Sequence, residues 1–432
     1  MAHDSYSAGW VAPVATGPLQ ARLVIPGSKS LTNRELVLSA LADSPSTLTA
    51  PLVARDTELM ADALRALGAA IDASPGAWRV TPGALHGGAE IHAGLAGTVM
   101  RFIPPVAALA DGPVTIDGDE HARKRPMRAT IDALRALGVA VDDDGRGGLP
   151  FTIHGDGMVE GGELQIDASA SSQFVSGLLL AAPRFRDGLV LRHTGERLPS
   201  LPHIEMTLES LRRRGVRVSS PEAATWVVEP GPIAGADHAI EPDLSNAGPF
   251  LAAALVAGGR VTIAGWPATT TQAGDLFATL LPRFGATVTR DADGLTVDGR
   301  EGLLGGRSWR GVDLDLSAGG ELAPTFAALA ALATTPSRIT GIGHLRGHET
   351  DRLAALAAEI TALGGRVTEE PDGLAFEPAP LHGGEWSSYA DHRMATTGAL
   401  LGLVVPGVVV DDIRTTSKTL PEFPALWETL SR

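Results

Sequence analysis

The chain of 432 residues is long enough for two or three domains, and its hydrophobic content of 44% is typical of a globular protein. Aromatic residues make up only 4% and the net charge is −15, which disfavours nucleic acids and acidic membranes as partners. The absence of cysteine excludes disulfides, cysteine-ligated metals and thiolate nucleophiles.

The first predicted elements are an apolar strand at Leu23–Ile25, a Pro-Gly turn and a helix that begins directly after it. Ser28 or Ser30 could cap this helix through a side-chain oxygen. The free N–H groups and the dipole of a helix start attract an anion, and Lys29 and Arg34 add two positive charges there. Ser30 and Arg34 are four residues apart and therefore share one face of the helix. We predict that this stretch binds an acid.

Two alternatives compete with this interpretation. Lys29 and Arg34 could be ordinary surface charges on a capped helix. The sequence Gly-Ser-Lys-Ser also resembles the end of a nucleotide-binding P-loop, but the lysine follows Ser28 instead of glycine and the required upstream glycine is missing. A P-loop is therefore rejected, whereas the surface-charge alternative stays open.

A helix that ends at a glycine and is followed by a short strand recurs along the chain. The closing glycines are spaced by 70 to 79 residues and suit a left-handed helix C-cap. They are Gly68, Gly138, Gly215, Gly285 and Gly364. A shortened last copy is expected at Pro421–Leu430.

More apolar, Ala-rich helices alternate with these. The six are Leu31–Ala42, Gly97–Ala110, Ser172–Ala182, Asn246–Ala257, Leu322–Ala333 and Met394–Leu403. Helices that are apolar on all sides are buried, so each repeat is expected to bury its first helix and expose its second. The pattern predicts an α/β protein with six repeats of a β-α-β-α-β type.

Six repeats divide naturally into three and three. The loosest connection is the Pro/Gly-rich stretch 229–238, which suits a domain boundary. We predict one domain at 22–240 and a second formed by 1–21 plus 241–432, with the opening strand expected in the second. The chain would then cross between the domains twice, near residues 22 and 240.

Polar residues gather at the starts of the buried helices, where an Ala/Leu-rich helix has no structural need for them. These stretches are Gly97–Arg101, Asp167–Gln173, Asp243–Asn246, Gly319–Glu321 and Asp391–Arg393. Each alone could be a plain capping motif. Because nearly every repeat has one, they predict helix N-termini that converge on a common cleft, where Ser171 and Ser172 could hold a phosphate.

Four further basic residues lie within or after these polar stretches. They are Arg125, Arg352, Arg393 and Lys418. An arginine fork grips a carboxylate or phosphate at two points, which indicates small acids as ligands. Glu321 and Glu349 stand among these cations and are candidates for proton transfer, although each could instead form an ion pair that neutralises an arginine. The histidines do not match zinc spacing, so no metal is expected.

These motifs resemble those of the 5-enolpyruvylshikimate-3-phosphate synthase family, in the family's order, from about residue 20 to the end. They are Pro26–Ser30, Asn33–Arg34, Ala96–Arg101, Arg125–Pro126, Ser171–Gln173, Glu349–Arg352, Asp391–Met394 and Lys418–Thr419. The resemblance implies two similar α/β domains, each of three βαβαββ repeats around buried parallel helices, an inside-out barrel-like arrangement. Two crossover segments would connect them, with the active site in the cleft between.

The resemblance also implies a transfer, without any cofactor, of the enolpyruvyl group from phosphoenolpyruvate to the 5-hydroxyl of shikimate 3-phosphate, with release of phosphate. Shikimate 3-phosphate would be bound by Lys29, Ser30, Arg34, Ser171, Ser172, Gln173, Ser200, Glu321 and His348. Phosphoenolpyruvate would be bound by Lys29, Gly97, Arg125, Gln173, Arg352, Arg393 and Lys418. Both substrates carry a carboxylate and a phosphate, which a local cluster of cations matches.

The implied reaction is addition followed by elimination. Glu321 would take the proton of the attacking hydroxyl, and Lys29 or Glu349 would protonate the methylene carbon before phosphate leaves a tetrahedral intermediate. Domain closure would expel water from this site. Most members that we compare have Asn, Asp and Lys where this chain has Leu95, Glu321 and His348. Glu321 keeps the carboxylate of aspartate but has a longer side chain, whereas His348 lacks the fixed positive charge of lysine.

Two other functions were weighed. The UDP-N-acetylglucosamine enolpyruvyl transferase resembles the same fold, but it normally uses a loop cysteine and lacks the serine pair. A non-catalytic repeat scaffold for an acidic metabolite would gain nothing from Glu321 and Glu349. We expect a cytoplasmic monomer without a signal peptide, and the most apolar stretch, 398–410, is too short to span a membrane.

Overall fold

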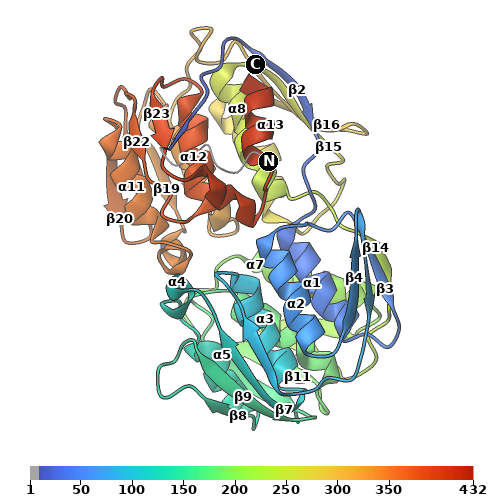
Figure 1. Ribbon diagram of the computed structural model, residues 1–432. Helices are drawn as coiled ribbons and strands as arrows, with labels where there is room; N and C mark the ends of the chain where they lie inside the picture. Colours follow the sequence, from blue (N-terminus) through green and yellow to red (C-terminus); the bar gives the residue numbers. More distant parts are fainter. Residues whose placement is uncertain (1–8, 432) are drawn as a thin grey trace. The chain divides into compact units, whose positions relative to one another are not determined.

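The computed structural model describes residues 9–431 of the chain. These residues form two compact units. One is Gly27–Glu241, and the other combines the segment that ends at Pro26 with the segment that begins at Pro242. We call them the 27–241 unit and the 242–431 unit, and the latter includes the N-terminal segment. In each unit, helices pack against several small sheets (Figure 1).

The second repeat of the 27–241 unit shows the common plan. Its elements are β6 (Ala89–His92), α3 (Gly97–Ala107), β7 (Asp111–Asp117), α4 (Glu120–Arg123), α5 (Arg128–Ala136), β8 (Ala140–Asp142) and β9 (Phe151–Asp156). The sheet order is β6-β7-β9-β8, with β6 parallel to β7 and the other pairs antiparallel. Apart from the short α4, this is a βαβαββ repeat, and α3 is the crossover helix between the parallel strands.

The third repeat of this unit follows the same plan. Its elements are β10 (Gly162–Ile166), α6 (Gln173–Ala181), η1 (Ala182–Arg184), β11 (Leu189–His193), α7 (Leu201–Arg213), β12 (Val218–Glu222) and β13 (Thr225–Val228). The first repeat contains α1 (Lys29–Ala40), β3 (Ser46–Thr49), α2 (Arg55–Ala66), β4 (Ala70–Ser74) and β5 (Ala77–Thr81). Its parallel partner strand, β14 (Asp237–Ala239), comes from the far end of the unit and pairs with β3.

The 242–431 unit repeats this arrangement. Its first sheet combines β2 (Leu19–Leu23), β15 (Gly259–Ala264), β16 (Thr287–Asp291) and β17 (Gly294–Arg300), with α8 (Leu244–Ala257) before β15. The next repeat contains β18 (Asp313–Asp315), η4 (Gly320–Leu322), α10 (Ala323–Ala331), β19 (Ser337–Thr340), η5 (Gly343–Gly347), α11 (Arg352–Ala362), β20 (Arg366–Glu370) and β21 (Gly373–Glu377). The last contains β22 (Gly384–Trp386), α12 (His392–Gly402), β23 (Val408–Val410), η6 (Ile413–Lys418) and α13 (Phe423–Ser431), and β1 (Trp10–Val11) joins its sheet.

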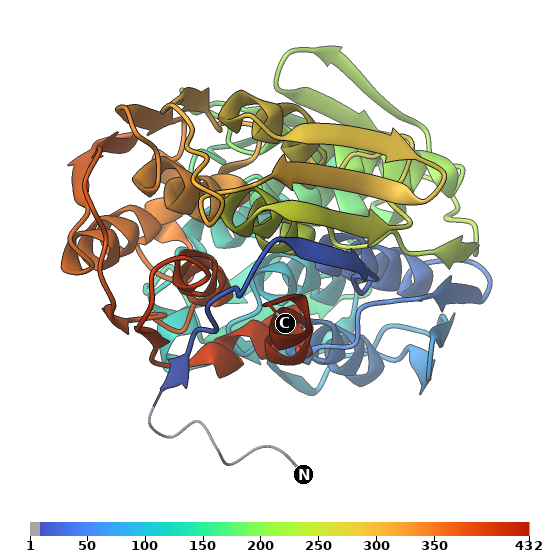
Figure 2. The same cartoon turned by 90° about the horizontal axis from the view of Figure 1, so that it is seen from above.

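The opening strand β2 lies in the 242–431 unit and spans Leu19–Leu23, whereas the sequence suggested a strand at Leu23–Ile25. Strand β2 precedes the whole 27–241 unit in sequence but pairs in parallel with β15, which begins at Gly259. Figure 2 shows β2 in blue beside the olive and gold strands of this sheet. The chain therefore crosses from one unit to the other at Pro26–Gly27 and returns at Glu241–Pro242. Two crossovers and three repeats per unit confirm the predicted fold class.

The predicted roles of the two helix types are confirmed. The apolar helices α3, α6, α8 and α10 are buried along nearly their whole length. Each unit has its own hydrophobic core built around such helices. The second helix of a repeat, such as α2, buries one face only. The five closing glycines all have positive φ, between 79° and 117°, which a side chain would disfavour.

One predicted helix is wrong. The segment ending at Gly285 is not a continuous helix but consists of η2 (Ala273–Leu276), α9 (Phe277–Leu280) and η3 (Leu281–Phe284). Pro282 lies within it, and proline removes a backbone donor and clashes with the preceding turn of an α-helix. The regular α-helix therefore ends after one turn.

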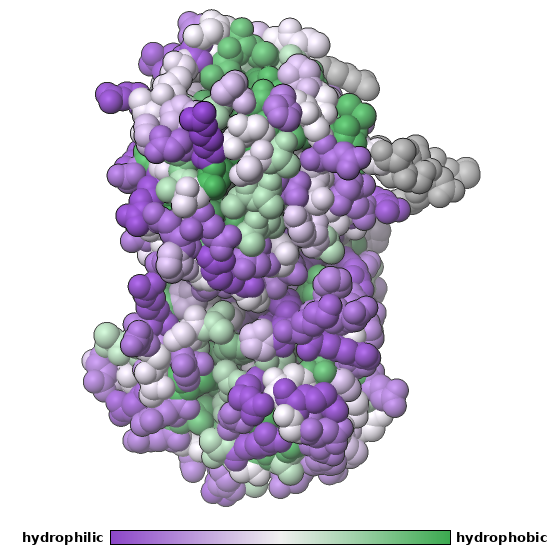
Figure 3. Space-filling model, turned by 90° about the vertical axis from the view of Figure 1, so that its left-hand side faces the viewer, coloured by the Kyte–Doolittle hydropathy of each residue, from purple (hydrophilic) through white to green (hydrophobic). Residues whose placement is uncertain are grey.

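The surface is mainly polar on the face shown in Figure 3, where hydrophobic residues are scattered among hydrophilic ones. Few large hydrophobic side chains are strongly exposed in the described residues; Val24 at 75% and Val11 at 65% are the most exposed of them. Within residues 9–431, none of the helices combines the length and apolar character that a bilayer crossing requires.

Candidate active site

In the 27–241 unit, the first turns of three buried helices lie together. Helix α1 begins at Lys29, where the Ser28 side chain accepts a hydrogen bond from the Leu31 N–H at 3.4 Å. The Asn33 amide of α1 donates to Thr98 Oγ1 of α3 at 2.6 Å. Arg34 of α1 also donates to Ser176 Oγ of α6 at 3.3 Å. Such a group of helix N-termini offers unpaired N–H groups and partial positive charge to an anion.

Arg34 is buried among neutral groups. Its guanidinium donates from Nε to Thr207 Oγ1 at 2.8 Å, and from Nη2 to the His203 carbonyl at 2.9 Å and Ser176 Oγ at 3.3 Å. Nη1 donates to the Ser30 carbonyl at 2.9 Å. The side chain is 1% exposed, so the alternative of a surface charge is wrong for Arg34.

The charge on Arg34 is poorly compensated within this unit. None of the residues described in the 27–241 unit forms an ion pair with it, because its neighbour Glu35 pairs with Arg214 at 2.7 Å. Burial lowers the pKa of Arg34 to about 9, although Glu35 opposes this shift. An arginine whose charge is disfavoured by burial gains from a nearby anion, which makes Arg34 a suitable residue for a substrate carboxylate.

Lys29 lies at the start of α1 with its side chain 18% exposed. Its Nζ is 3.1 Å from Oδ2 of Asp56, whose side chain is only 2% exposed in the first turn of α2. A buried carboxylate beside a partly exposed ammonium holds that ammonium in one position. Asp56 was not singled out in the sequence.

Gly97, Arg125 and Gln173 converge at the starts of α3 and α6. A Cβ on Gly97 would lie 3.1 Å from Nη2 of Arg125 and 3.1 Å from Oε1 of Gln173. Arg125 also donates from Nη1 to the Leu95 carbonyl at 3.2 Å. Only glycine leaves this space open, and the buried Oε1 of Gln173 has no hydrogen-bond partner among the described residues. The three residues therefore frame a small polar space.

The predicted phosphate serines precede two neighbouring helices. Ser171 Oγ accepts from the Gln173 N–H at 3.2 Å, and Ser172 is the buried N-cap residue of α6. Ser200 immediately precedes α7 with φ 53°, in the left-handed region. The first turns of α6 and α7 touch, since Ser176 Oγ lies 3.4 Å from the His203 carbonyl. The serines thus lie at adjacent helix starts.

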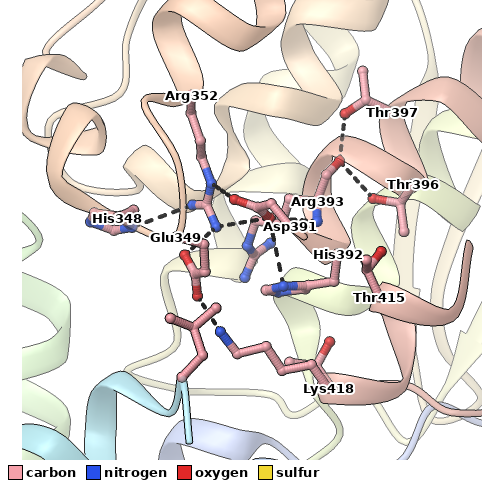
Figure 4. A network of polar contacts seen from close by, with 12 residues as sticks. His348, Glu349, Arg352, Asp391, His392, Arg393, Thr396, Thr397, Thr415 and Lys418 are labelled. Carbon is pink, nitrogen blue, oxygen red and sulfur yellow. Dashed lines mark hydrogen bonds and ion pairs between the residues drawn. The ribbon is translucent and has the colours of Figure 1, made fainter. Parts of the chain in front are cut away.

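In the 242–431 unit, a network centred on Arg352 joins α11 to α12 (Figure 4). Arg352 is 2% exposed and donates to Asp391 from Nε at 2.7 Å and from Nη2 at 3.2 Å. It also donates from Nη2 to Glu349 Oε2 at 2.9 Å, and its Nη1 lies 3.4 Å from Nδ1 of His348. Burial opposes the charge, but Asp391, Glu349 and Glu321 together raise the pKa of Arg352 above its ordinary value.

Glu349 links this network to the C-terminal segment. Its second oxygen, Oε1, lies 2.6 Å from Nζ of Lys418 at the end of η6. Both side chains are 9% exposed. One carboxylate thus lies between two cations, which agrees with the ion-pair alternative considered for Glu349 and is also compatible with proton transfer.

Arg393 lies next to Arg352 and has no ion-pair partner among the described residues of this unit. Burial and the positive charge of Arg352 lower the pKa of Arg393, while Glu321, Asp243 and Asp391 oppose the shift. Glu321, on η4 before α10, is 9% exposed and within electrostatic reach of both arginines. The starts of α8, α10 and α12 therefore bring carboxylates and arginines together.

Comparison with known proteins identifies the family. The sequence model of EPSP synthase (3-phosphoshikimate 1-carboxyvinyltransferase) matches residues 14–427. A 3-phosphoshikimate 1-carboxyvinyltransferase of Kocuria rhizophila is 57% identical over 98% of this chain and 96% of its own length. This chain belongs to the EPSP synthase family. The resemblance inferred from the motifs is therefore confirmed.

Solved structures of an EPSP synthase and of another enolpyruvyl transferase support the fold. The EPSP synthase of Acinetobacter baumannii has a TM-score of 0.79 at 23% identity, covering 98% of this chain and 97% of the other. The enolpyruvyl transferase NikO of Streptomyces tendae has a TM-score of 0.75 at 18% identity, with 96% of each chain covered. At these identities the likeness establishes the shared architecture alone.

The EPSP synthase motifs thus gather into two groups, one in each unit. The 27–241 unit holds Lys29, Ser30, Arg34, Gly97, Arg125, Ser171, Ser172, Gln173 and Ser200. The 242–431 unit holds Glu321, His348, Glu349, Arg352, Arg393 and Lys418. In the sequence, Asp56 had no assigned role and Asp391 belonged only to a helix-start motif, because the cations that they pair with are distant in the chain.

Proposed function

We propose that these two groups of side chains carry out the EPSP synthase reaction on one shared pair of substrates. The chain catalyses the transfer of the enolpyruvyl group of phosphoenolpyruvate to the 5-hydroxyl of shikimate 3-phosphate, with release of phosphate, a step of aromatic amino acid biosynthesis. The family match and the 57% identical curated relative support this reaction over that of the UDP-N-acetylglucosamine enolpyruvyl transferase.

For shikimate 3-phosphate, we propose that Arg34 and Ser30 hold the carboxylate. The poorly compensated charge of buried Arg34 supports this role. The phosphate would be held by Ser171, Ser172 and Ser200, since hydroxyl and N–H groups at helix starts bind phosphate oxygens. Glu321 and His348 would face the ring hydroxyls.

For phosphoenolpyruvate, we propose binding by residues of both groups. They are Lys29, Gly97, Arg125, Gln173, Arg352, Arg393 and Lys418. Gly97 leaves room beside the Arg125 guanidinium and the Gln173 amide. Arg352 and Arg393 are adjacent like charges, and a bound anion would relieve their repulsion.

The observation that carries the chemical assignment is that Glu321 and Glu349 lie among Arg352, Arg393 and Lys418. A protein that merely binds anions gains nothing from carboxylates at this place, because they repel the ligand. In the proposed reaction Glu321 takes the proton of the attacking 5-hydroxyl as the oxygen bonds to C2 of phosphoenolpyruvate. Lys29 or Glu349 delivers a proton to the methylene carbon, which becomes the methyl group of a tetrahedral intermediate. The C–O bond to phosphate then breaks while the methyl group returns a proton to the same residue, which restores the enol double bond.

A phosphate-release assay with each substrate alone and with both together tests this function. We expect phosphate only when phosphoenolpyruvate and shikimate 3-phosphate are both present. Release with UDP-N-acetylglucosamine instead would assign the rival reaction, and no release with either acceptor would leave an anion-binding protein.

We further propose that the chain acts as a monomer in the cytoplasm. All residues proposed for catalysis belong to one chain, so no second copy is needed to complete the set. Sedimentation velocity at micromolar concentration should give the mass of one chain, and fractionation should place the native protein with soluble cytoplasmic enzymes.

A further inference from the structure

A strained turn leads directly into the Asp391–Arg393 motif. Tyr389 has φ 54° and Ala390 has φ 55°, so two consecutive residues with side chains occupy the left-handed region. This conformation is uncommon for residues other than glycine and persists only where the surroundings enforce it. The turn lies between β22 and α12, and the Asp391 N–H closes it by donating to the Ser388 carbonyl at 2.9 Å.

The side chain of Glu359 holds this turn with both oxygens. Oε1 accepts a hydrogen bond from the Tyr389 hydroxyl at 2.6 Å, and Oε2 accepts from the Ser387 N–H at 2.9 Å. Glu359 is 8% exposed, so most of its side chain is shielded from water. The next N–H, of Ser388, donates to Asp411 Oδ1 at 2.8 Å. A carboxylate with two charge-assisted hydrogen bonds fixes the backbone of the turn more firmly than neutral partners would.

Helix α11 contacts the turn at two points. Arg352 and Glu359 are seven residues apart on α11, which is close to two full turns, so they lie on one face of the helix. Glu359 holds the beginning of the turn, at Ser387 and Tyr389, and Arg352 holds its end at Asp391 through bonds of 2.7 and 3.2 Å. The orientation of the Arg352 guanidinium is therefore linked to the conformation of the whole segment.

We propose that Glu359 is a positioning residue for the enolpyruvyl transfer: by clamping Ser387 and Tyr389 it keeps the turn strained, and the strained turn places Asp391 against Arg352 and sets the direction of Arg393. The proposal rests on the assignment of Arg352 and Arg393 to phosphoenolpyruvate made above. Glu359 itself touches neither arginine in the described contacts and acts only through the turn.

The ionisation of Tyr389 reflects the same clamp. The hydrogen bond to Glu359, together with burial and the negative charge of that carboxylate, raises the pKa of Tyr389 to about 12. The chain contains only one other tyrosine, Tyr6. A Tyr6→Phe protein therefore reports Tyr389 alone through its tyrosinate absorbance.

The first experiment compares three substitutions by steady-state kinetics with each substrate varied. Glu359→Leu removes both hydrogen bonds at nearly constant size. Glu359→Gln keeps them, because its amide oxygen can accept from Ser387 while its NH₂ donates to the Tyr389 oxygen. Glu377→Gln, on the exposed end of β21, is the matched control.

We expect Glu359→Leu to raise KM for phosphoenolpyruvate about tenfold or more, since small displacements of binding groups have large effects on productive geometry. KM for shikimate 3-phosphate should change less than twofold, because most of its proposed residues lie in the other unit. Glu359→Gln should restore KM for phosphoenolpyruvate to within threefold of wild type, and Glu377→Gln should not differ from wild type. A purely structural role would instead lower the unfolding temperature with both KM values unchanged, and that result would overturn the proposal.

Tyr389→Phe provides a second variant, which removes one hydrogen bond from a side chain that is 40% exposed and so is expected to fold. It should raise KM for phosphoenolpyruvate by a smaller factor than Glu359→Leu.

In the Tyr6→Phe background, Glu359→Gln should let Tyr389 ionise near its ordinary pKa of about 10. If Tyr389 ionises with a pKa near about 10 in the Tyr6→Phe protein that still has Glu359, the hydrogen bond between Glu359 and Tyr389 is absent and the proposal fails. If wild type needs both substrates for phosphate release but Tyr389→Phe and Glu359→Leu leave both KM values unchanged, only the positioning role fails and the function stands.

Discussion

Nζ of Lys418 lies 2.6 Å from Oε1 of Glu349, although 69 residues separate them in the sequence. The same carboxylate accepts a hydrogen bond from Arg352 at 2.9 Å. Two cations thus neutralise one carboxylate in the free protein. The negative charges of the substrates would compete with Glu349 for Lys418 and Arg352.

Glu349→Gln tests whether this carboxylate moves a proton. The amide keeps the size of the side chain but cannot transfer a proton, so we expect kcat to fall by about 10²–10⁴. Steady-state phosphate release measures it, and Glu377→Gln, an exposed glutamate of the same unit, should retain full activity. If Glu349→Gln changes only KM for phosphoenolpyruvate, Glu349 neutralises its arginine and Lys29 remains the candidate donor.

Lys29→Ala removes the ammonium at the start of α1. We expect less than about 1% of wild-type turnover, because a fixed charge at a developing anion contributes on the order of 10²–10³ in rate. The control is Lys124→Ala, whose side chain is 67% exposed and lies 3.6 Å from Glu120. Circular dichroism must show equal folding in both variants, since Asp56 loses its partner in the first. Wild-type turnover of a folded Lys29→Ala protein would remove Lys29 from the site.

Gly97→Ala adds one methyl group between Arg125 and Gln173. The new Cβ would lie 3.1 Å from an atom of each, so one of the two side chains must move. We expect KM for phosphoenolpyruvate to rise about tenfold, equivalent to ~1.4 kcal/mol, with a smaller change in kcat. Gly231→Ala, where a Cβ meets nothing within 4 Å, serves as the control. An unchanged KM would place the phosphoenolpyruvate site away from Gly97.

Part of the fold could be predicted from the sequence because it depends on local signals. The repeat pattern and the closing glycines report local backbone geometry, so they gave the six buried helices and the C-caps at Gly68 and Gly364. The charge partners depend on contacts between distant segments. These ion pairs produce no periodic pattern in the sequence, because a carboxylate with a buried partner looks like any surface carboxylate. The two pairs are Asp56–Lys29 and Asp391–Arg352.

The helix predicted before Gly285 is interrupted for a local reason that is visible in the sequence. Pro282 lies three residues before Gly285, where a proline interrupts the hydrogen bonds of an α-helix. The apolar pattern around it was still that of a helix, so the periodicity outweighed the proline in the prediction. The structure keeps the glycine cap, with φ 93° at Gly285, and loses only the regular helix before it.

Asp143 provides a test of stability against pH. Its carboxylate accepts hydrogen bonds from Arg135 at 2.7 Å, from the Gly147 N–H at 2.6 Å and from the Gly145 N–H at 3.2 Å. The Arg135 bond and these N–H groups lower the pKa of Asp143 to about 2 from an ordinary value of 3.8. Because the folded pKa is the lower one, the stabilisation is complete above pH ~4 and is lost as the pH falls toward 2.

Asp143→Asn should therefore lower the unfolding temperature at pH 7 and lower it less at pH 3, where the wild-type carboxylate has already lost part of its advantage. Differential scanning calorimetry at both pH values measures the two differences. Asp187→Asn, whose side chain is 63% exposed, should shift the unfolding temperature little at either pH. An equal loss for Asp143→Asn at pH 7 and pH 3 would mean that the hydrogen bonds stabilise the loop through geometry alone and that the charge of Asp143 contributes nothing.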